Sequence, residues 1–475
     1  MKNGKATIRL MGRRITAYIL IACMLVTMAP TLGAMTGNAN DYQAYADENS
    51  TGTNAESAAN YAYSTQAHEN HENTVTTAKT VTTYQDLSNA LSASGEADVI
   101  IGADITITGS MTVNGTKHVY TEAGQEYTIK RGSGFTDGAL FSVSSSAALI
   151  LGDGSLSHES AAFSETDAQK GRYAVNQSGG SLIIDGGAVW VKDSEYVRGT
   201  DFVNNAATRA VFYDLTDGKQ YYYDNTAVVS TESIIVNSGS MSIWGGVTIC
   251  NGAKAGLYGG AINCGTTGIL DMYGGVITMC DTTGTGKDCG QGAVYLGNNH
   301  DGVVQSTRYA ATMTMYGGSI INNTTSGSRY NSEVSREDGG GLAMDNAQAV
   351  MYGGSISYNH AGVYMGDGAG DGGGVMVRGG SVFTLWNGSI DHNYAGGYGG
   401  GLVTWNGDII IHGGNITSNV AAYGGGFAIA TDGTSRVQMD GGVIAYNEAI
   451  KPNFSSSTGV IPTDAGYGGG ICVGT

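Results

Sequence analysis

Helical periodicity is missing from most of this 475-residue chain. Apolar residues instead alternate with a period of two, as in Met313-Thr-Met315 and Phe383-Thr-Leu385, and no repeat unit contains ten residues of helical spacing. A leucine-rich or ankyrin-type solenoid is therefore excluded, because each of its units needs a helix. The sequence predicts short strands.

Basic residues are few: the chain has 23 Lys and Arg against 41 Asp and Glu, which gives a formal net charge of −18. Such acidity argues against nucleic acid and anionic membrane surfaces as partners. Cysteine is also scarce. The five beyond residue 46 are an odd number, so no disulfide framework follows: Cys250, Cys264, Cys280, Cys289 and Cys472. The alternation turns Cys264 inward, which predicts a buried thiol.

Only one apolar run is long, and it lies at the start of the chain. Basic residues precede the run from Ile15 to Met28, and small residues follow it, which predicts a secretory signal peptide over residues 1–46 with cleavage after Ala39 or Ala46. No later run approaches the roughly 20 residues that span a bilayer, so no transmembrane segment is expected in the mature chain. The protein is expected to be secreted, extracellular and displayed at the cell surface.

Residues 47–80 have almost no aliphatic bulk and predict a flexible linker. Thr83 with Asp86 three residues later then forms a helix start signal, and Leu87, Ala90 and Leu91 share one apolar face. We expect a short amphipathic helix that caps the first strands of the following array.

One pattern recurs through the rest of the chain. It has a glycine triplet, an apolar-x-apolar triplet, a turn, a second such triplet, and then Gly-Gly-x-Ile-x-x-Asn with small variations. The unit is about 25 residues long, a length typical of solenoid repeats. Six copies end in asparagine: Asn251, Asn323, Asn359, Asn393, Asn419 and Asn447. A seventh copy has Cys280 in that place.

Three short strands per unit fit one turn of a right-handed parallel β-helix, whose coils stack ~4.8 Å apart. The fold class predicted for residues 81–475 is therefore all-β. Asparagines in one column would tolerate a left-handed corner and pass side-chain hydrogen bonds along the stack as a structural ladder. The register is interrupted over residues 188–236, where residues 210–215 and 219–223 predict a projecting β-hairpin. The chain stops partway through a unit at Thr475, which favours a fragment of a longer protein.

The repeated Ile-x-x-Asn and the Gly-Gly-Ala-Ile at Gly259 resemble the repeats of chlamydial polymorphic outer-membrane proteins. More broadly, residues 81–475 resemble the pectate-lyase-like β-helix superfamily, although Ile replaces Phe in most copies. The resemblance implies a surface adhesin with a membrane or wall anchor.

An aromatic column is predicted beside the second apolar triplet, where alternation turns the next residue outward: Trp244, Tyr273, Tyr316, Tyr352 and Trp386. Spaced one coil apart, these rings could form a platform for sugar faces. They could equally stack on one another and stiffen a corner. A second hypothesis places ligand specificity on the connections that follow the asparagine corner, which are long at residues 324–338, 360–371 and 448–467.

Cleavage of a polysaccharide would require carboxylates that converge on a glycosidic bond. The repeats contain no Asp-Asp pair and offer only scattered candidates: Asp338, Asp371, Arg336 and Arg378. His412 is interpreted as a repeat position. No catalytic residue, metal site or cofactor is predicted, although Asp367 and Asp371 weakly resemble a calcium-binding nonapeptide.

The sequence thus favours a β-helix adhesin that binds a glycan or a host-surface protein. A polysaccharide lyase or glycoside hydrolase is the first alternative, and a passive surface stalk is the second.

Overall fold

The computed structural model describes residues 78–152, 180–196, 209–214, 219–225, 230–256, 258–265, 267–284, 291–297, 311–327, 338–362, 370–430, 435–450 and 466–474. All of them fall within one compact unit. The predicted signal peptide lies outside the described residues, as does the predicted linker up to residue 77. The last residues assigned to that linker belong to a strand, because β1 (Lys79–Val81) pairs with β2 (Ala97–Ile101).

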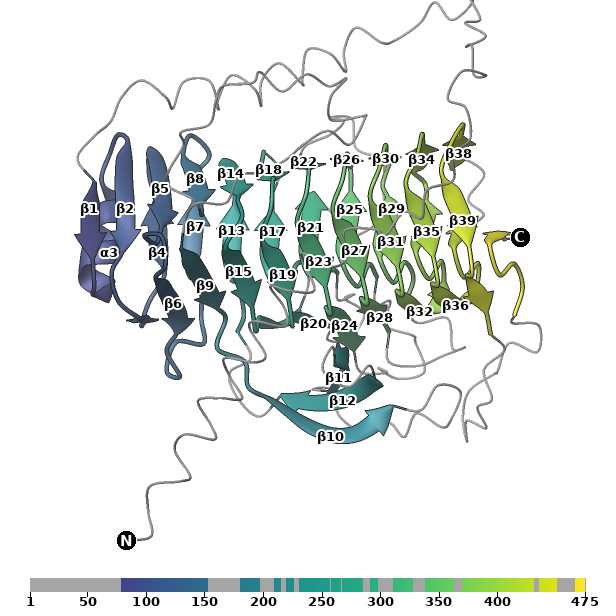
Figure 1. Cartoon of the computed structure of the whole chain (residues 1–475), viewed down its shortest axis with the longest axis horizontal. Helices are drawn as coiled ribbons and strands as arrows, with labels where there is room; N and C mark the ends of the chain where they lie inside the picture. The colour runs from purple at the N-terminus through teal and green to yellow at the C-terminus, as the bar shows by residue number, and fades with distance from the viewer. Residues whose placement is uncertain are drawn as a thin grey trace, which may run out of the picture. The chain divides into compact units, whose positions relative to one another are not determined.

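The chain folds as a parallel β-helix, as the alternation predicts. Four long sheets run along it, and within each sheet every strand pairs in parallel with the equivalent strand of the next coil (Figure 1). We number the sheets by their order within a repeat unit. Sheet 1 follows the glycine triplet, sheet 2 contains the second apolar triplet, sheet 3 follows Gly-Gly, and sheet 4 follows the asparagine corner.

Sheet 1 consists of β4 (Met111–Val113), β7 (Phe141–Val143), β13 (Ile235–Asn237), β17 (Ile262–Cys264), β21 (Val294–Gly297), β25 (Leu342–Asp345), β29 (Val375–Arg378), β33 (Leu402–Trp405), β37 (Phe427–Ile429) and β41 (Ile471–Val473). Sheet 2 consists of β1, β2, β5 (Thr116–Tyr120), β8 (Ala148–Leu151), β14 (Ser240–Ile243), β18 (Ile269–Met272), β22 (Ala311–Met315), β26 (Ala347–Met351), β30 (Val382–Leu385), β34 (Asp408–Ile411) and β38 (Arg436–Met439).

Sheet 3 consists of β3 (Ile105–Ile107), β6 (Glu126–Arg131), β9 (Ser181–Asp185), β15 (Val247–Cys250), β19 (Val276–Thr278), β23 (Ser319–Ile321), β27 (Ser355–Ser357), β31 (Ser389–Asp391), β35 (Asn415–Thr417) and β39 (Val443–Ala445). Sheet 4 consists of β16 (Ala253–Ala255), β20 (Asp281–Gly284), β24 (Thr324–Gly327), β28 (His360–Ala361), β32 (Tyr394–Tyr398), β36 (Val420–Tyr423) and β40 (Glu448–Ala449).

Sheet 4 is the main departure from the predicted three strands per unit. From β16 onward each coil has a fourth short strand immediately after the asparagine corner. These strands carry little aliphatic alternation, as in Thr324-Thr-Ser-Gly327, so the apolar period did not reveal them. Their backbone groups are nevertheless paired from coil to coil, for example Thr324 with His360.

The core is the interior of the coil. Alternation is direct in β22, where Ala311, Met313 and Met315 are buried and the threonines between them are half-buried. Isoleucines line the interior of sheet 3 in one column: Ile277, Ile320, Ile356, Ile390 and Ile416. Cys264 is fully buried in the same core, as predicted.

The predicted capping helix is α3 (Tyr84–Ser92). The Thr83 hydroxyl accepts a hydrogen bond from the Asp86 backbone N–H at 3.2 Å, which satisfies one unpaired donor of the first turn. Leu87 and Leu91 are buried against the first strands, so α3 covers the end of the core (Figure 1).

The predicted hairpin is part of a three-stranded antiparallel sheet. β11 (Arg209–Asp214) and β12 (Lys219–Asn225) pair as an antiparallel ladder, and β10 (Trp190–Tyr196) pairs with the other edge of β12. We refer to β10, β11 and β12 together as the insertion. β11 packs against β24 of sheet 4.

Candidate functional site

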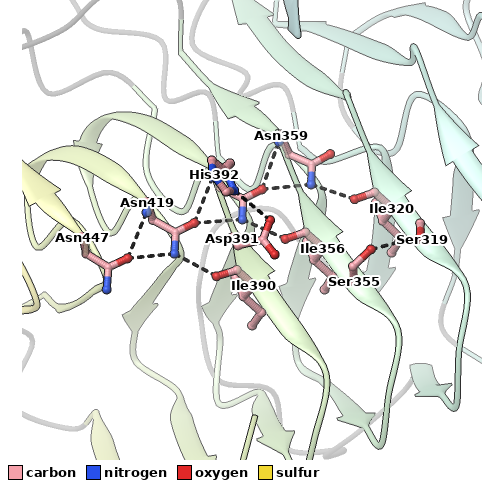
Figure 2. Close-up of polar contacts among 11 residues, drawn as sticks. Ser319, Ile320, Ser355, Ile356, Asn359, Ile390, Asp391, His392, Asn419 and Asn447 are labelled. Atoms are coloured by element: carbon pink, nitrogen blue, oxygen red, sulfur yellow. Dashed lines mark hydrogen bonds and ion pairs between the residues drawn. The ribbon is translucent and has the colours of Figure 1, made fainter. Parts of the chain in front are cut away.

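Asparagine side chains form a continuous hydrogen-bonded ladder at the corner between sheets 3 and 4 (Figure 2). In the middle of it, Asn393 Nδ2 donates to Asn419 Oδ1 at 3.0 Å and to the Ile356 carbonyl at 2.8 Å. Asn393 Oδ1 in turn accepts from the backbone N–H and from Nδ2 of Asn359. The same bonds link Asn323, Asn359, Asn393, Asn419 and Asn447. Every amide in the interior of this ladder is saturated, which fits a structural role.

Asn251 was wrongly predicted to belong to this ladder. β15 pairs Thr248 with Val276 and Cys250 with Thr278, so Asn251 aligns with Met279 and Gly252 takes the ladder position. Asn251 shares the left-handed backbone of that column, with φ of 57°, and its Nδ2 donates to Asp185 at 3.3 Å. One extra residue causes the shift, and the sequence carries its signal, because Ile249 stands one place later after Gly-Gly than the isoleucine of the other copies.

The predicted aromatic column exists, but its rings face one another. Trp244 stacks on Tyr273 with ring centroids 4.2 Å apart, and Tyr273 stacks on Tyr316 at 4.9 Å. Tyr316 continues the stack onto Tyr352 at 5.5 Å. The exposed fractions of Trp244, Tyr273 and Tyr352 are 2%, 5% and 3%. The prediction of an open platform is wrong for these three rings, because each stacks on a neighbouring ring and its side chain is buried.

The fifth predicted ring, Trp386, stacks on His412 at 3.9 Å. His412 Nδ1 lies 2.8 Å from Asp440 Oδ1, so the column ends in an imidazole–carboxylate pair. This geometry agrees with the interpretation of His412 as a repeat position. These stacks match the alternative in which neighbouring rings stabilise a corner.

A second apolar cluster lies on the outer face of sheet 1. Its buried members share one outward column: Tyr295, Ala343, Met376, Val403 and Ala428. Tyr398 and Trp405 are partly buried against it. This column is buried, whereas Tyr398 and Trp405 beside it are half-buried aromatic side chains that a ligand can reach, so this face is the candidate site.

Two aspartates from one coil hold a buried arginine from the next at this face. Arg378 donates from Nε to Asp345 Oδ2 and from a terminal nitrogen to Asp338 Oδ2, each at 3.1 Å. The exposed fractions of Arg378, Asp338 and Asp345 are 6%, 1% and 0%. A guanidinium can be buried at tolerable cost when carboxylates pair with it in this way. The structure thus brings together Asp338 and Arg378, which the sequence left scattered, and adds Asp345.

The next coil repeats the arrangement with an indole in place of the guanidinium. Trp405 occupies the position after Arg378 in sheet 1, and its Nε1 donates to Asp371 Oδ2 at 3.2 Å. Asp371 Oδ1 accepts the Tyr398 backbone N–H at 2.7 Å. Asp371 is 5% exposed, so a buried carboxylate fixes the orientation of a half-buried tryptophan.

Two tyrosines complete what we term the Trp405 cluster, namely Trp405, Tyr398, Tyr423 and Asp371. Tyr398 meets Trp405 edge to face, with centroids 6.1 Å apart and an interplanar angle of 89°. Tyr398 also stacks on Tyr423 at 4.7 Å. All three aromatic side chains are half-buried, whereas Trp244, Tyr273 and Tyr352 of the predicted column are buried.

The electrostatics of this face are acidic. Three carboxylates, those of Asp338, Asp345 and Asp371, share it with one guanidinium, and two of them already bind that guanidinium. No cationic group among these residues is therefore left to attract an anionic ligand.

Sequence reasoning missed the Trp405 cluster although a signal was present. The residue directly before the glycine triplet is Tyr in three copies, at Tyr398, Tyr423 and Tyr467, and Asp in two, at Asp338 and Asp371. This column does not follow the apolar alternation, so the period of two did not reveal it. Trp405 appeared in the sequence only as the last residue of a strand.

A buried histidine lies in sheet 4. The His360 ring stacks on Tyr394 with centroids 4.2 Å apart, and the side chain is 2% exposed. Burial lowers the pKa of His360 to about 3, an effect that the Gly362 backbone opposes only in part. His360 is therefore neutral at physiological pH.

Four cysteines are free thiols, and Cys289 lies outside the described residues. Burial raises the pKa of Cys264 and of Cys280 to about 12, so neither is a thiolate at neutral pH. Within the described ranges, no group of three or more His, Cys, Asp or Glu is placed to hold a metal ion. A helix long and apolar enough to cross a membrane is likewise not found in the part of the chain that the structure describes.

Comparison with protein-family models, with curated proteins and with solved structures gives no match. The candidate site must therefore be interpreted from its own geometry. Most of the long connections predicted to carry specificity lie outside the described residues, as do Asp367 and Arg336. Asp371, the other residue of the calcium hypothesis, is engaged with Trp405 and Tyr398.

Proposed function

We propose that this chain is a secreted, surface-displayed β-helix adhesin that binds a glycan through the Trp405 cluster. The observation that carries the proposal is a half-buried tryptophan whose indole N–H is anchored by a buried carboxylate, Asp371. Aromatic rings offer broad apolar area to sugar faces, and a ring held in place loses little entropy when a ligand binds. The likeness of the repeats to polymorphic outer-membrane proteins, within the pectate-lyase-like superfamily, supports an adhesin.

The hydrogen bonds of the carboxylates favour binding over cleavage. Hydrolysis of a glycoside needs one carboxyl group as acid and a second as base or nucleophile, both facing the glycosidic bond. Asp338 and Asp345 instead bind Arg378 and are at most 1% exposed, and Asp371 holds Trp405 and Tyr398. These contacts support a structural role for the three carboxylates, with Asp371 holding Trp405 in place.

Glycan binding by the purified chain tests the proposal, with release of reducing ends measured on the same samples. Trp405→Ala is expected to weaken binding by about 30-fold, equivalent to roughly 2 kcal/mol for loss of a central aromatic anchor. Trp405→Phe keeps the apolar ring but loses the bond to Asp371, so an intermediate loss is expected.

Trp386→Ala is the matched control, because Trp386 is stacked in the other column and should leave binding unchanged. Equal losses in both alanine variants would point to general destabilisation and contradict the assignment. Release of reducing ends by the wild-type chain would favour a hydrolase or lyase instead.

A further inference from the structure

The insertion meets the β-helix at the corner between sheets 3 and 4. β11 packs against β24, and the Tyr213 ring from β11 stacks on Tyr358 with centroids 4.2 Å apart and an interplanar angle of 17°. The insertion is the largest described break in the repeat. Breaks in a solenoid mark places where residues can be chosen for binding rather than for the coil.

Two further polar side chains join this corner from the next coil. The Tyr358 ring stacks on His392 with centroids 4.7 Å apart. His392 Nδ1 lies 3.1 Å from Asp391 Oδ1, and Figure 2 shows the contact between these two side chains. Residues far apart in the sequence thus converge on one corner: Tyr213, Tyr358, Asp391 and His392.

This corner is partly accessible to solvent, in contrast to the buried rings of Trp244, Tyr273 and Tyr352. The His392 side chain is 48% exposed and that of Asp391 is 23% exposed, while Tyr213 and Tyr358 are half-buried. Because Asp391 engages Nδ1, the imidazole presents Nε2 to a ligand. Burial, with Tyr213 and Asp391 nearby, raises the pKa of Tyr358, so its hydroxyl stays protonated and can donate.

We propose that Tyr213, Tyr358, Asp391 and His392 form a second saccharide subsite, so that one linear uncharged polysaccharide is held at two places on the molecule. The inference rests on the proposed function of the Trp405 cluster. Ring faces at this corner are taken up by stacking, so recognition uses edges: the phenol hydroxyls, Nε2 and the carboxylate are partners for sugar hydroxyl groups.

Two subsites on one polymer give a length dependence. When the first subsite is occupied, the second binds at an effective concentration set by the polymer, which increases overall affinity by about 10²- to 10⁴-fold over a single subsite. A short oligosaccharide occupies one subsite at a time and gains nothing. Loss of the second subsite should therefore weaken the binding of long polysaccharides and leave the binding of short oligosaccharides unchanged.

Isothermal titration with a soluble neutral polysaccharide and with its trisaccharide fragment tests this inference. Mixed-linkage β-glucan, arabinoxylan and galactomannan form the panel from which the best-binding pair is taken. His392→Ala and Tyr213→Phe are expected to raise the Kd for the polymer at least 10-fold and to leave the Kd for the trisaccharide within twofold. Trp405→Ala should weaken both ligands.

Tyr446→Ala is the matched control, because Tyr446 occupies the same left-handed column as Tyr358 and His392 but is 89% exposed. It should bind both ligands like the wild type. Unchanged polymer affinity in His392→Ala and Tyr213→Phe, with a loss in Trp405→Ala, would overturn the second subsite and leave the proposed function standing. No binding of any polysaccharide by the wild type would overturn both.

Discussion

At the scale of single residues, the asparagine ladder predicts a large cost for removing one amide. Asn393→Ala leaves the Asn359 amide group, the Asn359 backbone N–H and the Ile356 carbonyl without their partner in a buried corner. Each unsatisfied buried group costs about 1–3 kcal/mol, so destabilisation of at least about 3 kcal/mol is expected. The midpoint of chemical unfolding, followed by circular dichroism, measures it.

Asn415→Ala is the control for this variant, since Asn415 is exposed on the outer row of sheet 3 and should change stability by at most about 0.5 kcal/mol. Asn393→Asp keeps the accepting oxygen but loses both N–H donors and adds a buried charge, so it should be at least as unstable as Asn393→Ala. Equal unfolding midpoints for Asn393→Ala and Asn415→Ala would contradict the prediction that the side-chain hydrogen bonds of the ladder stabilise the fold.

His360 predicts a pH dependence of stability. Its folded pKa of about 3 lies below the ordinary value of 6.5, so below that value the unfolded chain binds a proton that the folded chain does not. The contribution of neutral His360 to the free energy of unfolding is therefore fully present above pH 6.5. It is lost as the pH falls toward 3, at about 1.4 kcal/mol per pH unit. At about pH 4.5 the expected loss is on the order of 3 kcal/mol.

His360→Phe isolates this contribution, because it keeps a ring against Tyr394 and cannot be protonated. The difference in unfolding midpoint between wild type and variant should widen from about pH 7 to about pH 4.5. Burial raises the pKa of Asp271 to about 6, so Asp271 makes the folded chain more stable as the pH falls. This effect is the same in wild type and variant and cancels when their midpoints are subtracted. A difference that stays constant with pH would show that His360 is protonated in the folded chain.

At the scale of elements, alternation and capping were enough to predict the fold. The period of two placed Met313 and Met315 in the core, and Thr83 with Asp86 marked the start of α3. Sheet 4 could not be predicted in this way, because its strands are held by pairing between coils while their own residues, such as Thr324 and Thr325, show no apolar period. The third strand of the insertion, β10, was missed because its partner β12 lies across a long connection.

The candidate site depended on contacts between coils, and these are not visible in the motif. Alternation correctly gave the stacked order of Trp244, Tyr273 and Tyr316, yet it cannot distinguish an open ring from a stacked one. The pairing of Trp405 with Asp371 joins the end of one strand to the residue before the strand of the preceding coil. Such a diagonal contact requires the register, which one extra residue can shift, as it does at Asn251.

At the scale of the whole molecule, charge predicts which glycans bind. The formal net charge is −18, and the face that holds the Trp405 cluster carries three carboxylates against one guanidinium already bound to two of them. An anionic polymer such as polygalacturonate should therefore bind at least 10-fold more weakly than an uncharged polysaccharide of similar length.

Raising the salt concentration from about 20 mM to about 500 mM shortens the Debye length severalfold. It should strengthen the weak binding of polygalacturonate by screening repulsion and leave the uncharged ligand unaffected. Affinity electrophoresis at the two salt concentrations measures both ligands, and polygalacturonate binding that is tight at low salt and lost at high salt would show that a cationic site, not the Trp405 cluster, governs recognition.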